Sequence, residues 1–311
     1  MNRIDLNKVK RYSVLDRKTK SNIKSFAKAP KPIKSFFEAL PDFLKAADLK
    51  ALARDIVDAQ KRGRGIIWMM GAHPIKVGLS PVIIDLIKNG CITHLALNGA
   101  SAIHDLEIAF WGQTSEEVAE SLSDGSFGMV KETPLYLAEA LSESDNETGI
   151  GEAVGGYIHR QKPEFASYSI LACAYKYKIP VSIHIAIGTD TICQHPEFDA
   201  AIWGCKSHLD FKMLAESIKN IHNKGLIINF GSAVVLPEVF LKALTTARNI
   251  YGKITDFSAA NFDMIQHYRP NENVVKRPTI DGGRRYIFTG HHEIMMPLLS
   301  AAIKSFKKQK E

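Results

Sequence analysis

Short apolar runs alternate with longer stretches of helical periodicity, and this alternation constrains the fold more than any other feature. The runs lie at 65–70, 92–97, 179–187, 226–230, 254–257 and 285–289, and helix-like segments between them lie at 81–89, 115–122, 165–177, 212–223 and 237–250. Strands covered on both faces are continuous apolar runs, and a β-α-β-α order requires parallel pairing through helical crossovers. We therefore predict an α/β fold, a Rossmann-like, doubly wound, mostly parallel six-stranded sheet with helices on both faces.

The first 34 residues differ from the rest of the chain. They contain few large apolar side chains and end in Ala29-Pro30-Lys31-Pro32. We predict a basic N-terminal arm over 1–34 with at most one short helix, followed by a single α/β domain over 35–311. Apolar residues at helical spacing over 36–61, interrupted at Pro41, predict a helical start to that domain, and the polar stretch 142–148 predicts a surface loop.

The positive charge of the chain is confined to its two ends. The 311 residues carry a formal net charge of +7. Residues 1–34 hold eleven Lys and Arg against two Asp, a net of +9, and the tail from Lys304 adds +3, which leaves −5 for 35–303. A mildly acidic body argues against a polyanion-binding protein, and the arm has little aromatic interleaving, so nucleic-acid binding is disfavoured.

No apolar run approaches the ~20 residues that a membrane span needs, and the N-terminus lacks the apolar core of a signal peptide. Four cysteines without a CxxC pair are too few for a disulfide framework in a chain of this length. We expect a cytoplasmic protein with no membrane contact.

Small and polar residues follow the predicted strands. Ligands bind where parallel strands end, and small residues there let backbone amides approach a phosphate or ribose. The candidate cofactor-binding residues at these positions are Ala72, His73, Asn98, Gly99, Ala100, Ser101, Thr189, Asp190, Gly231, Ser232, Asn261 and Asp263. Short βα turns favour small residues in any α/β protein, so this pattern alone leaves both readings open.

Two further motifs have competing explanations. The glycines at 149, 151 and 155 follow a polar loop with the wrong spacing, so we reject them as a dinucleotide fingerprint. Asp105 lies near the start of a predicted helix, where a carboxylate either caps the helix or contacts a ligand.

The remaining polar clusters contain candidate metal-binding or catalytic residues. His291, His292 and Glu293 precede a closing apolar helix, but two adjacent histidines cannot both face one metal from a helix. The Cys193, His195, Cys205 and His208 group lacks a tight ligand pair, so we predict no metal site. Glu272 and Lys276 lie four residues apart in a polar loop, where a solvated lysine is the commoner arrangement.

The order of these motifs over residues 40–305 resembles the deoxyhypusine synthase family. The resemblance rests on Asn98 to Asp105, on Ile179-Pro-Val with Thr189-Asp190, on Arg269-Pro-Asn-Glu272 running to Lys276, and on Tyr286 to Leu299. It implies that an NAD cofactor takes a hydride from spermidine, and that a lysine of the enzyme captures the aminobutyl portion as an imine and passes it to a lysine of a translation factor. It also implies a tetramer with sites shared between subunits.

Carried over by position, the resemblance assigns roles to several residues. His104 and Asp105 fall on acidic positions near the nicotinamide and the amine, Glu272 falls on an amine-binding glutamate, and Lys276 lies near the catalytic lysine. Cofactor contacts fall on Ala72, His73, Gly99 to Ser101, Asp190, Gly231 and Ser232. The acidic Glu293 also suits a cationic amine.

The chain departs from the family pattern at four places, and alternatives follow from this. His104 replaces an amine-binding acid, and a Ser/Asp-rich loop before Arg269 is shortened. Val274-Val275 stands where the family has a tryptophan, and Leu236-Pro237 where it has a catalytic histidine. We hypothesise that His291 or His292 supplies the base, with Lys276 as nucleophile. The alternatives are transfer to a free diamine, as in homospermidine synthase, and a binding module for NAD and polyamines without turnover.

Overall fold

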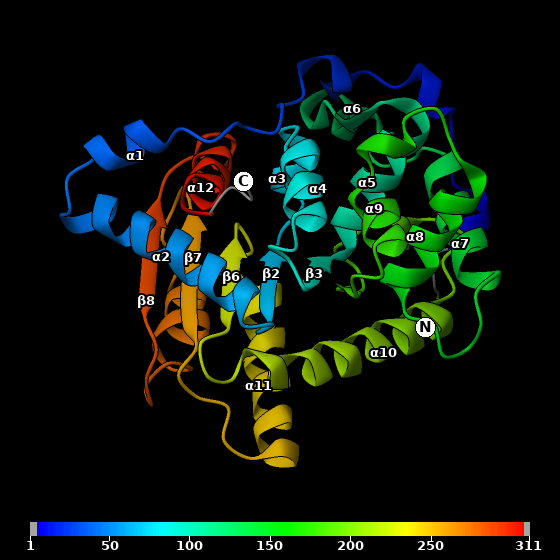
Figure 1. Ribbon diagram of the computed structural model, residues 1–311. Coiled ribbons are helices and arrows are strands. Elements are labelled where there is room, and N and C mark those ends of the chain that lie inside the picture. The colour runs from blue at the N-terminus through cyan, green and yellow to red at the C-terminus, as the bar shows by residue number, and fades with distance from the viewer. Residues whose placement is uncertain (1–4, 308–311) are drawn as a thin grey trace.

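The computed structural model describes residues 5–307 and contains one six-stranded parallel sheet (Figure 1). In spatial order its strands are β5 (Val181–His184), β3 (His94–Asn98), β2 (Ile66–Met70), β6 (Leu226–Phe230), β7 (Ser258–Asp263) and β8 (Arg285–Thr289). Counted along the chain, this is the order 3-2-1-4-5-6 of a doubly wound dinucleotide-binding sheet. The predicted fold class is confirmed.

Helices cover both faces of the sheet. One layer and the β3–β5 end are formed by α2 (Leu44–Lys61), α4 (Ser80–Lys88), α5 (Gly99–Trp111), α8 (Ile150–Gln161), α9 (Ile170–Lys176) and α12 (His292–Phe306). The opposite layer consists of α10 (Ala200–Ile218), α11 (Val235–Tyr251) and the π-helix η7 (Pro270–Lys276). Shorter helices are α1 (Lys34–Ala39), α3 (His73–Lys76), α6 (Val118–Asp124) and α7 (Glu132–Ser142). In Figure 1, α5, α7, α8 and α9 gather beyond β3.

Alternating side chains of each strand enter the two cores. In β2, Trp68 and Met70 pack in the larger core and Ile67 and Met69 in the other, all fully buried. Aromatic rings then stack across neighbouring strands on one face, with centroid distances of 5.2 Å for Trp68–Phe230 and 4.3 Å for Phe230–Phe262. These stacked aromatic rings lie directly beneath the carboxyl ends of β6 and β7.

Two predicted element boundaries are wrong. The run 254–257 precedes the fifth strand, which is β7 over 258–263. Apolarity missed this strand because both of its faces are buried and they carry Ser258 and Asn261, one on each face, among small apolar side chains. The segment 115–122 is not one helix, because Gln113–Glu116 forms strand β4 before α6 begins. In the predicted loop 142–148, Ser142 ends α7, and residues 143–148 lie between α7 and α8, outside helices and strands.

The N-terminal segment folds onto the acidic body of its own chain. It contains the 3-10 turns η1 (Leu6–Lys8), η2 (Val14–Asp16) and η3 (Ile23–Ser25), and strand β1 (Thr19–Asn22), which pairs antiparallel with β4. This exceeds the one short helix that we predicted. Four of its cations pair with body carboxylates, as Arg11–Glu197, Arg17–Glu107, Lys18–Glu120 and Lys20–Glu117. The domain division at residue 34 stays a prediction.

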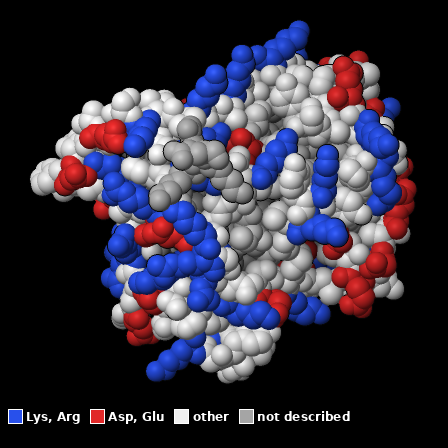
Figure 2. Space-filling view, in the orientation of Figure 1, with Lys and Arg blue, Asp and Glu red and all other residues white. Residues whose placement is uncertain are grey.

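Charges of both signs are interspersed on the face drawn in Figure 2. Of the basic tail, Lys304 and Lys307 are described and contact Asp85 and the Asn89 carbonyl, whereas Lys308, Lys310 and Glu311 lie outside the described part of the chain. The glycines of α8 serve packing, since a Cβ at Gly151 would lie 2.0 Å from the Val181 carbonyl oxygen and one at Gly155 2.6 Å from that of Leu171.

Candidate functional site

The chain reverses its winding direction between β2 and β6, and the two strands end side by side in glycines. A Cβ at Gly71 would lie 2.9 Å from the carbonyl oxygen of Gly231, and Gly231 has a left-handed φ of +67°. From Gly231 the chain passes through Ser232 into α11, whose Leu236 amide donates to the Ser232 hydroxyl at 3.2 Å. Ligands of doubly wound sheets bind at such a reversal point.

Two histidines meet above these glycines. The rings of His73 and His292 lie 5.3 Å apart, and a Cβ at Gly231 would be 2.4 Å from Cε1 of His292. His292 Nε2 lies 3.4 Å from the Phe262 carbonyl, which can only accept, so Nε2 carries the proton. Its buried Nδ1, which has no hydrogen-bond partner in residues 5–307, is then a free acceptor. Burial lowers the pKa of both imidazoles, so they are neutral near pH 7.

Acidic groups flank this pair. Asp263 and Glu293 both raise the pKa of His73 and His292 by their charge, against the larger effect of burial. Glu293 is about half exposed, and His291 beside it is largely exposed with Nδ1 3.7 Å from the Glu293 carboxylate. The structure therefore brings together His73, Gly231, Asp263, His292 and Glu293 at one edge.

Asn261 is a strand residue rather than a loop residue. It accepts from Asn229 Nδ2 at 2.8 Å and donates from its own Nδ2 to Gln266 and Asn271. All these groups are internal to the fold, so Asn261 links β6, β7 and η7 beneath the edge. This corrects its expected direct role in cofactor binding.

Asp105 also has a different role from the one expected. It is fully buried, and its carboxylate accepts from Ser169 Oγ at 2.6 Å and from the amides of Ile170 and Leu171 at 2.7 and 3.1 Å. These are the first groups of α9, so Asp105 stabilises the start of a neighbouring helix instead of facing a ligand. Capping was the correct alternative, although the capped helix is not its own.

The polar side chains at the ends of β3 and β5 largely form hydrogen bonds within the chain itself. The Asn98 side chain accepts from the amide and hydroxyl of Ser101 at the start of α5. Asp190 packs against Gly99, where a Cβ would lie 2.2 Å from its Oδ2, and it accepts from the Ala100 amide. Thr189 is exposed and donates to the Ala186 carbonyl at 2.8 Å. An internal carboxylate thus occupies the place predicted for a cofactor anion.

Lys276 and Glu272 lie apart from the histidine pair. Lys276 ends η7 with its side chain about half exposed, and its Nζ lies 2.6 Å from Glu272 Oε1. Arg285, the first residue of β8, contacts Thr279 just beyond this turn, so the end of η7 lies near the amino-terminal end of β8. Within the described chain no hydrogen bond or ion pair joins Lys276 to His291 or His292.

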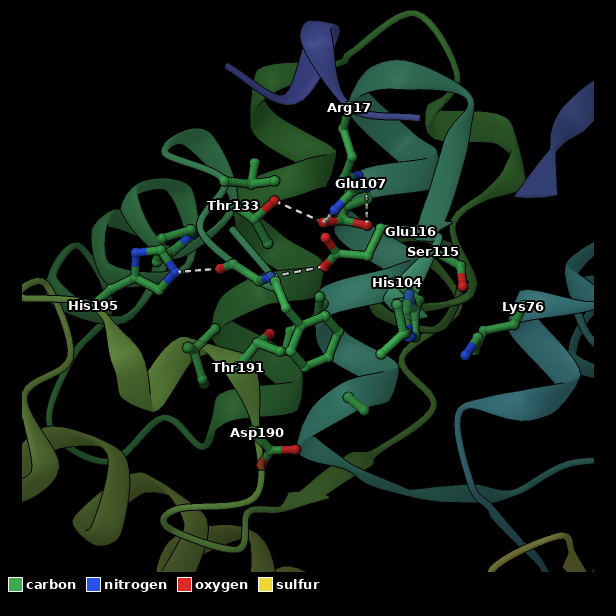
Figure 3. Close-up of a pocket in the computed structure, with 18 of the residues that line it drawn as sticks. Arg17, Lys76, His104, Glu107, Ser115, Glu116, Thr133, Asp190, Thr191 and His195 are labelled. Atoms are coloured by element: carbon green, nitrogen blue, oxygen red, sulfur yellow. Dashed lines mark hydrogen bonds and ion pairs between the residues drawn. The ribbon is translucent and has the colours of Figure 1, made fainter. Parts of the chain in front are cut away.

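A partly open pocket of about 160 Å³ adjoins the ends of β3 and β5 (Figure 3). Its wall combines the arm, α5, β4 and the loop after β5. The polar side chains on it are Arg17, Lys76, His104, Glu107, Ser115, Glu116, Thr133, Thr189, Asp190, Thr191 and His195. Among the predicted residues, Ala100, His104, Thr189 and Asp190 therefore share this cavity, whereas His73 and His292 lie outside its lining.

A buried relay fixes His104 in this wall. Arg17 donates two hydrogen bonds to Glu107, at 2.9 and 2.7 Å, and Thr133 donates a third at 2.9 Å. Burial acts to raise the pKa of Glu107, but the Arg17 guanidinium outweighs it and holds this pKa below its usual range. Thr114 donates to Glu107 at 2.5 Å, so its oxygen accepts from His104 Nδ1 at 2.7 Å. Burial lowers the pKa of His104 to about 4.

Sequence reasoning missed Arg17, Lys76, Thr114 and Ser115. Arg17 was grouped with a solvated arm, Ser115 fell at the start of a predicted helix, and Thr114 lay just before it. The available signal was Glu107 itself, because a carboxylate within an apolar helix requires a cationic partner from elsewhere. Over 5–307 no three His, Cys, Asp or Glu side chains converge as metal ligands, and no helix there has the length and apolarity to cross a bilayer.

No family model and no curated protein matches this sequence. Three solved structures share the fold. One is a conserved protein from Methanococcus maripaludis S2, provisionally assigned as LOR/SDH, with 17% identity, a TM-score of 0.50, and coverage of 88% of this chain and 73% of that one. Unliganded AgrE has 13% identity, a TM-score of 0.53, and coverage of 84% and 33%.

The third structure is a protein from Entamoeba histolytica, provisionally assigned as a deoxyhypusine synthase. It has 11% identity, a TM-score of 0.50, and coverage of 86% of this chain and 90% of that one. The chain spans about one third of AgrE. At these identities the likeness establishes a common fold. The third structure carries the provisional name of the family that the motif order of this chain resembles.

Proposed function

We propose that this chain is an NAD-dependent enzyme that oxidises an amine, with NAD held across the edge where β2 and β6 end. One observation carries the proposal: two glycine-ended strands meet at the winding reversal beneath a pair of neutral histidines, one with an unpartnered buried nitrogen. The residues fit a dinucleotide, because the glycines leave backbone open to a close approach and the turn into α11 presents the amino end of a 17-residue helix.

The neighbours support the cofactor. AgrE, whose unliganded form shares this fold, has also been solved in a ternary complex with ornithine and NAD+. That ligand set belongs to AgrE, of which this chain spans one third, so for this chain NAD is a proposal to be tested by direct binding.

The residues at the edge suit amine oxidation. Bound NAD supplies the nicotinamide that accepts the hydride. Asp263 and Glu293 provide negative charge for a protonated amine, and His292 Nδ1 provides a lone pair that takes the proton released when the C–N bond becomes an imine. Burial keeps His292 neutral near pH 7, which is the form required of a base.

The finer form of the proposal is transfer of a 4-aminobutyl group from spermidine or a related polyamine to an amine acceptor, through an imine on Lys276. The motif order supports it. Glu272 would then bind the amine end, and the Lys276–Glu272 pair has to open before Nζ attacks. Transfer to a free diamine, and a non-catalytic NAD and polyamine module, are the alternatives.

We also propose that the chain assembles with copies of itself and works in the cytoplasm. Large apolar side chains stand exposed around the same edge, at Ile187, Val234, Ile265, Tyr268 and Ile294, each at least half exposed. A covering subunit would bury them, and the motif order supports a tetramer. The four cysteines are all unpaired, in keeping with a reducing compartment.

The test is NADH formation from NAD+ with spermidine, putrescine and other amines, followed by borohydride trapping and peptide mapping. We expect amine-dependent NADH, a loss of about tenfold or more in His292→Asn, and no change in His208→Asn, an exposed control on α10. An adduct on Lys276 supports the transferase. NAD binding without turnover supports the module, and no NAD binding refutes the proposal.

A further inference from the structure

The pocket beside β3 and β5 has charges left over after its internal pairs are formed. Arg17 and Glu107 neutralise each other. Glu116 accepts from the Gly128 amide at 2.9 Å and keeps its negative charge, and Lys76 keeps its positive charge. Its Nζ makes no hydrogen bond or ion pair with any residue of 5–307, and Figure 3 shows its side chain reaching toward His104.

His104 presents a hydrogen-bond acceptor to the same space. The single proton of Thr114 goes to Glu107, so the Thr114 oxygen must accept from His104, and Nδ1 of His104 carries the ring proton. Nε2 then holds a lone pair. Because burial and the adjacent Lys76 charge both lower the pKa of His104, to about 4, the ring stays neutral near pH 7 and Nε2 stays an acceptor.

Two more groups complete the polar lining. Ser115 has a left-handed φ of +65° inside strand β4, a conformation disfavoured for serine, and it lines the cavity with a hydroxyl that donates to no group in residues 5–307. Asp190 lines the opposite side near the start of α5, and burial raises the pKa of its carboxyl group. The pocket thus offers the Lys76 cation, the Ser115 hydroxyl, a neutral acceptor on His104 and the carboxyl groups of Asp190 and Glu116.

Size limits what can enter. The volume of about 160 Å³ is well below the ~300 Å³ at which pockets for larger ligands begin, so the pocket suits a molecule of the size of a small amino acid rather than a dinucleotide.

We propose that this cavity is a binding site for a small α-amino acid in its zwitterionic form, with the carboxylate on Lys76 and Ser115 and the ammonium on His104 Nε2 and Asp190. A polyamine would bring further positive charge against Lys76, and a simple carboxylic acid would leave His104 Nε2 without a donor and Asp190 without a cation. The site is separate from the proposed NAD edge, so it stands whether or not that proposal holds.

The test is calorimetric titration of the full chain with L-alanine and L-serine, against ethylamine and propionate, which each lack one charged group. We expect both amino acids to bind at least tenfold more tightly than either control. Lys76→Met should weaken amino-acid binding at least tenfold and leave ethylamine binding unchanged, while Lys212→Met, an exposed control on α10, should behave as the wild type.

Ser115→Gly provides a second variant that relieves the left-handed strain and should fold at least as well. It should weaken amino-acid binding severalfold without lowering the melting temperature. The proposal is overturned if neither amino acid binds, if propionate or ethylamine binds as tightly, or if Lys76→Met binds like the wild type. NAD binding and NADH formation are measured separately and do not enter this result.

Discussion

Replacing Arg17 by Met should lower the free energy of unfolding more than any other single substitution in the N-terminal segment. The Arg17 and Glu107 side chains are 6% and 2% exposed. Their two hydrogen bonds join the segment just before β1 to α5. Removing one partner of a buried pair leaves the other charge without compensation, which costs about 3–5 kcal/mol. We expect the free energy of unfolding in urea to fall by about that amount.

The pH dependence of this variant should also invert. In the wild type the pKa of Glu107 is depressed on folding, so its contribution to stability is present above about pH 4.3 and is lost as the pH falls. Without Arg17, burial is opposed mainly by the hydrogen bonds from Thr114 and Thr133, and we expect it to raise the pKa of Glu107. Stability of Arg17→Met should therefore decline as the pH rises from about 4.3, and Arg17→Met with Glu107→Gln should recover part of the loss.

Lys18→Met is the matched control, since Lys18 pairs with Glu120 in the same segment but both side chains are more than half exposed. It should leave the unfolding curve unchanged. If Arg17→Met and Lys18→Met have equal effects, the segment is not held by the buried pair and the reasoning fails.

Three further predictions follow from buried groups and from glycine geometry. Burial raises the pKa of Asp210 to about 8, so ionisation of this carboxyl group opposes folding. The free energy of unfolding of the wild type, measured in urea, should decline between about pH 4 and 8, and Asp210→Asn should reduce the slope of that decline. An unchanged slope in the variant contradicts this. Gly231→Ala should destabilise by more than 1 kcal/mol because its φ is +67° and a Cβ would meet His292, whereas Gly204→Ala, with open space in α10, should be neutral or stabilising; calorimetric melting temperatures decide. Thr114→Val should abolish the Nδ1 proton preference of His104 and cost about 1–3 kcal/mol, and 15N NMR of the ring would show a retained tautomer if the relay is wrong.

The sheet was predictable because continuous apolar runs report directly on burial from both sides. β2 satisfies this rule fully, and β6 satisfies it at every residue except Asn229. β7 does not, because it buries Asn261, whose side chain accepts from Asn229 in the neighbouring strand. A pattern of apolarity along one strand contains no information on a polar partner in the next strand.

The candidate site was predicted only at the level of strand ends. His73, Gly231 and His292 converge because the strand order brings the ends of β2, β6 and β8 near one another. The role of Asp105 could not be predicted, because a carboxylate that caps a distant helix has the same local sequence as one that faces a ligand.

Lys76 and Arg17 were missed for a related reason. Their roles depend on the cavity wall contributed by the N-terminal segment, which pairs with β4 at a separation of about ninety residues in the sequence. Nothing in the local spacing of charges in that segment distinguishes a buried arginine from its solvated neighbours.

The most direct test of the central claim is hydrogen exchange of the protein with and without NAD+, followed by peptide mass spectrometry. The account predicts protection in peptides covering 70–77 and 230–238, which contain Gly71, His73 and Gly231, and no protection in 113–130 at the cavity wall. Protection confined to 113–130, or no protection at saturating NAD+, would contradict a dinucleotide site at the β2–β6 edge.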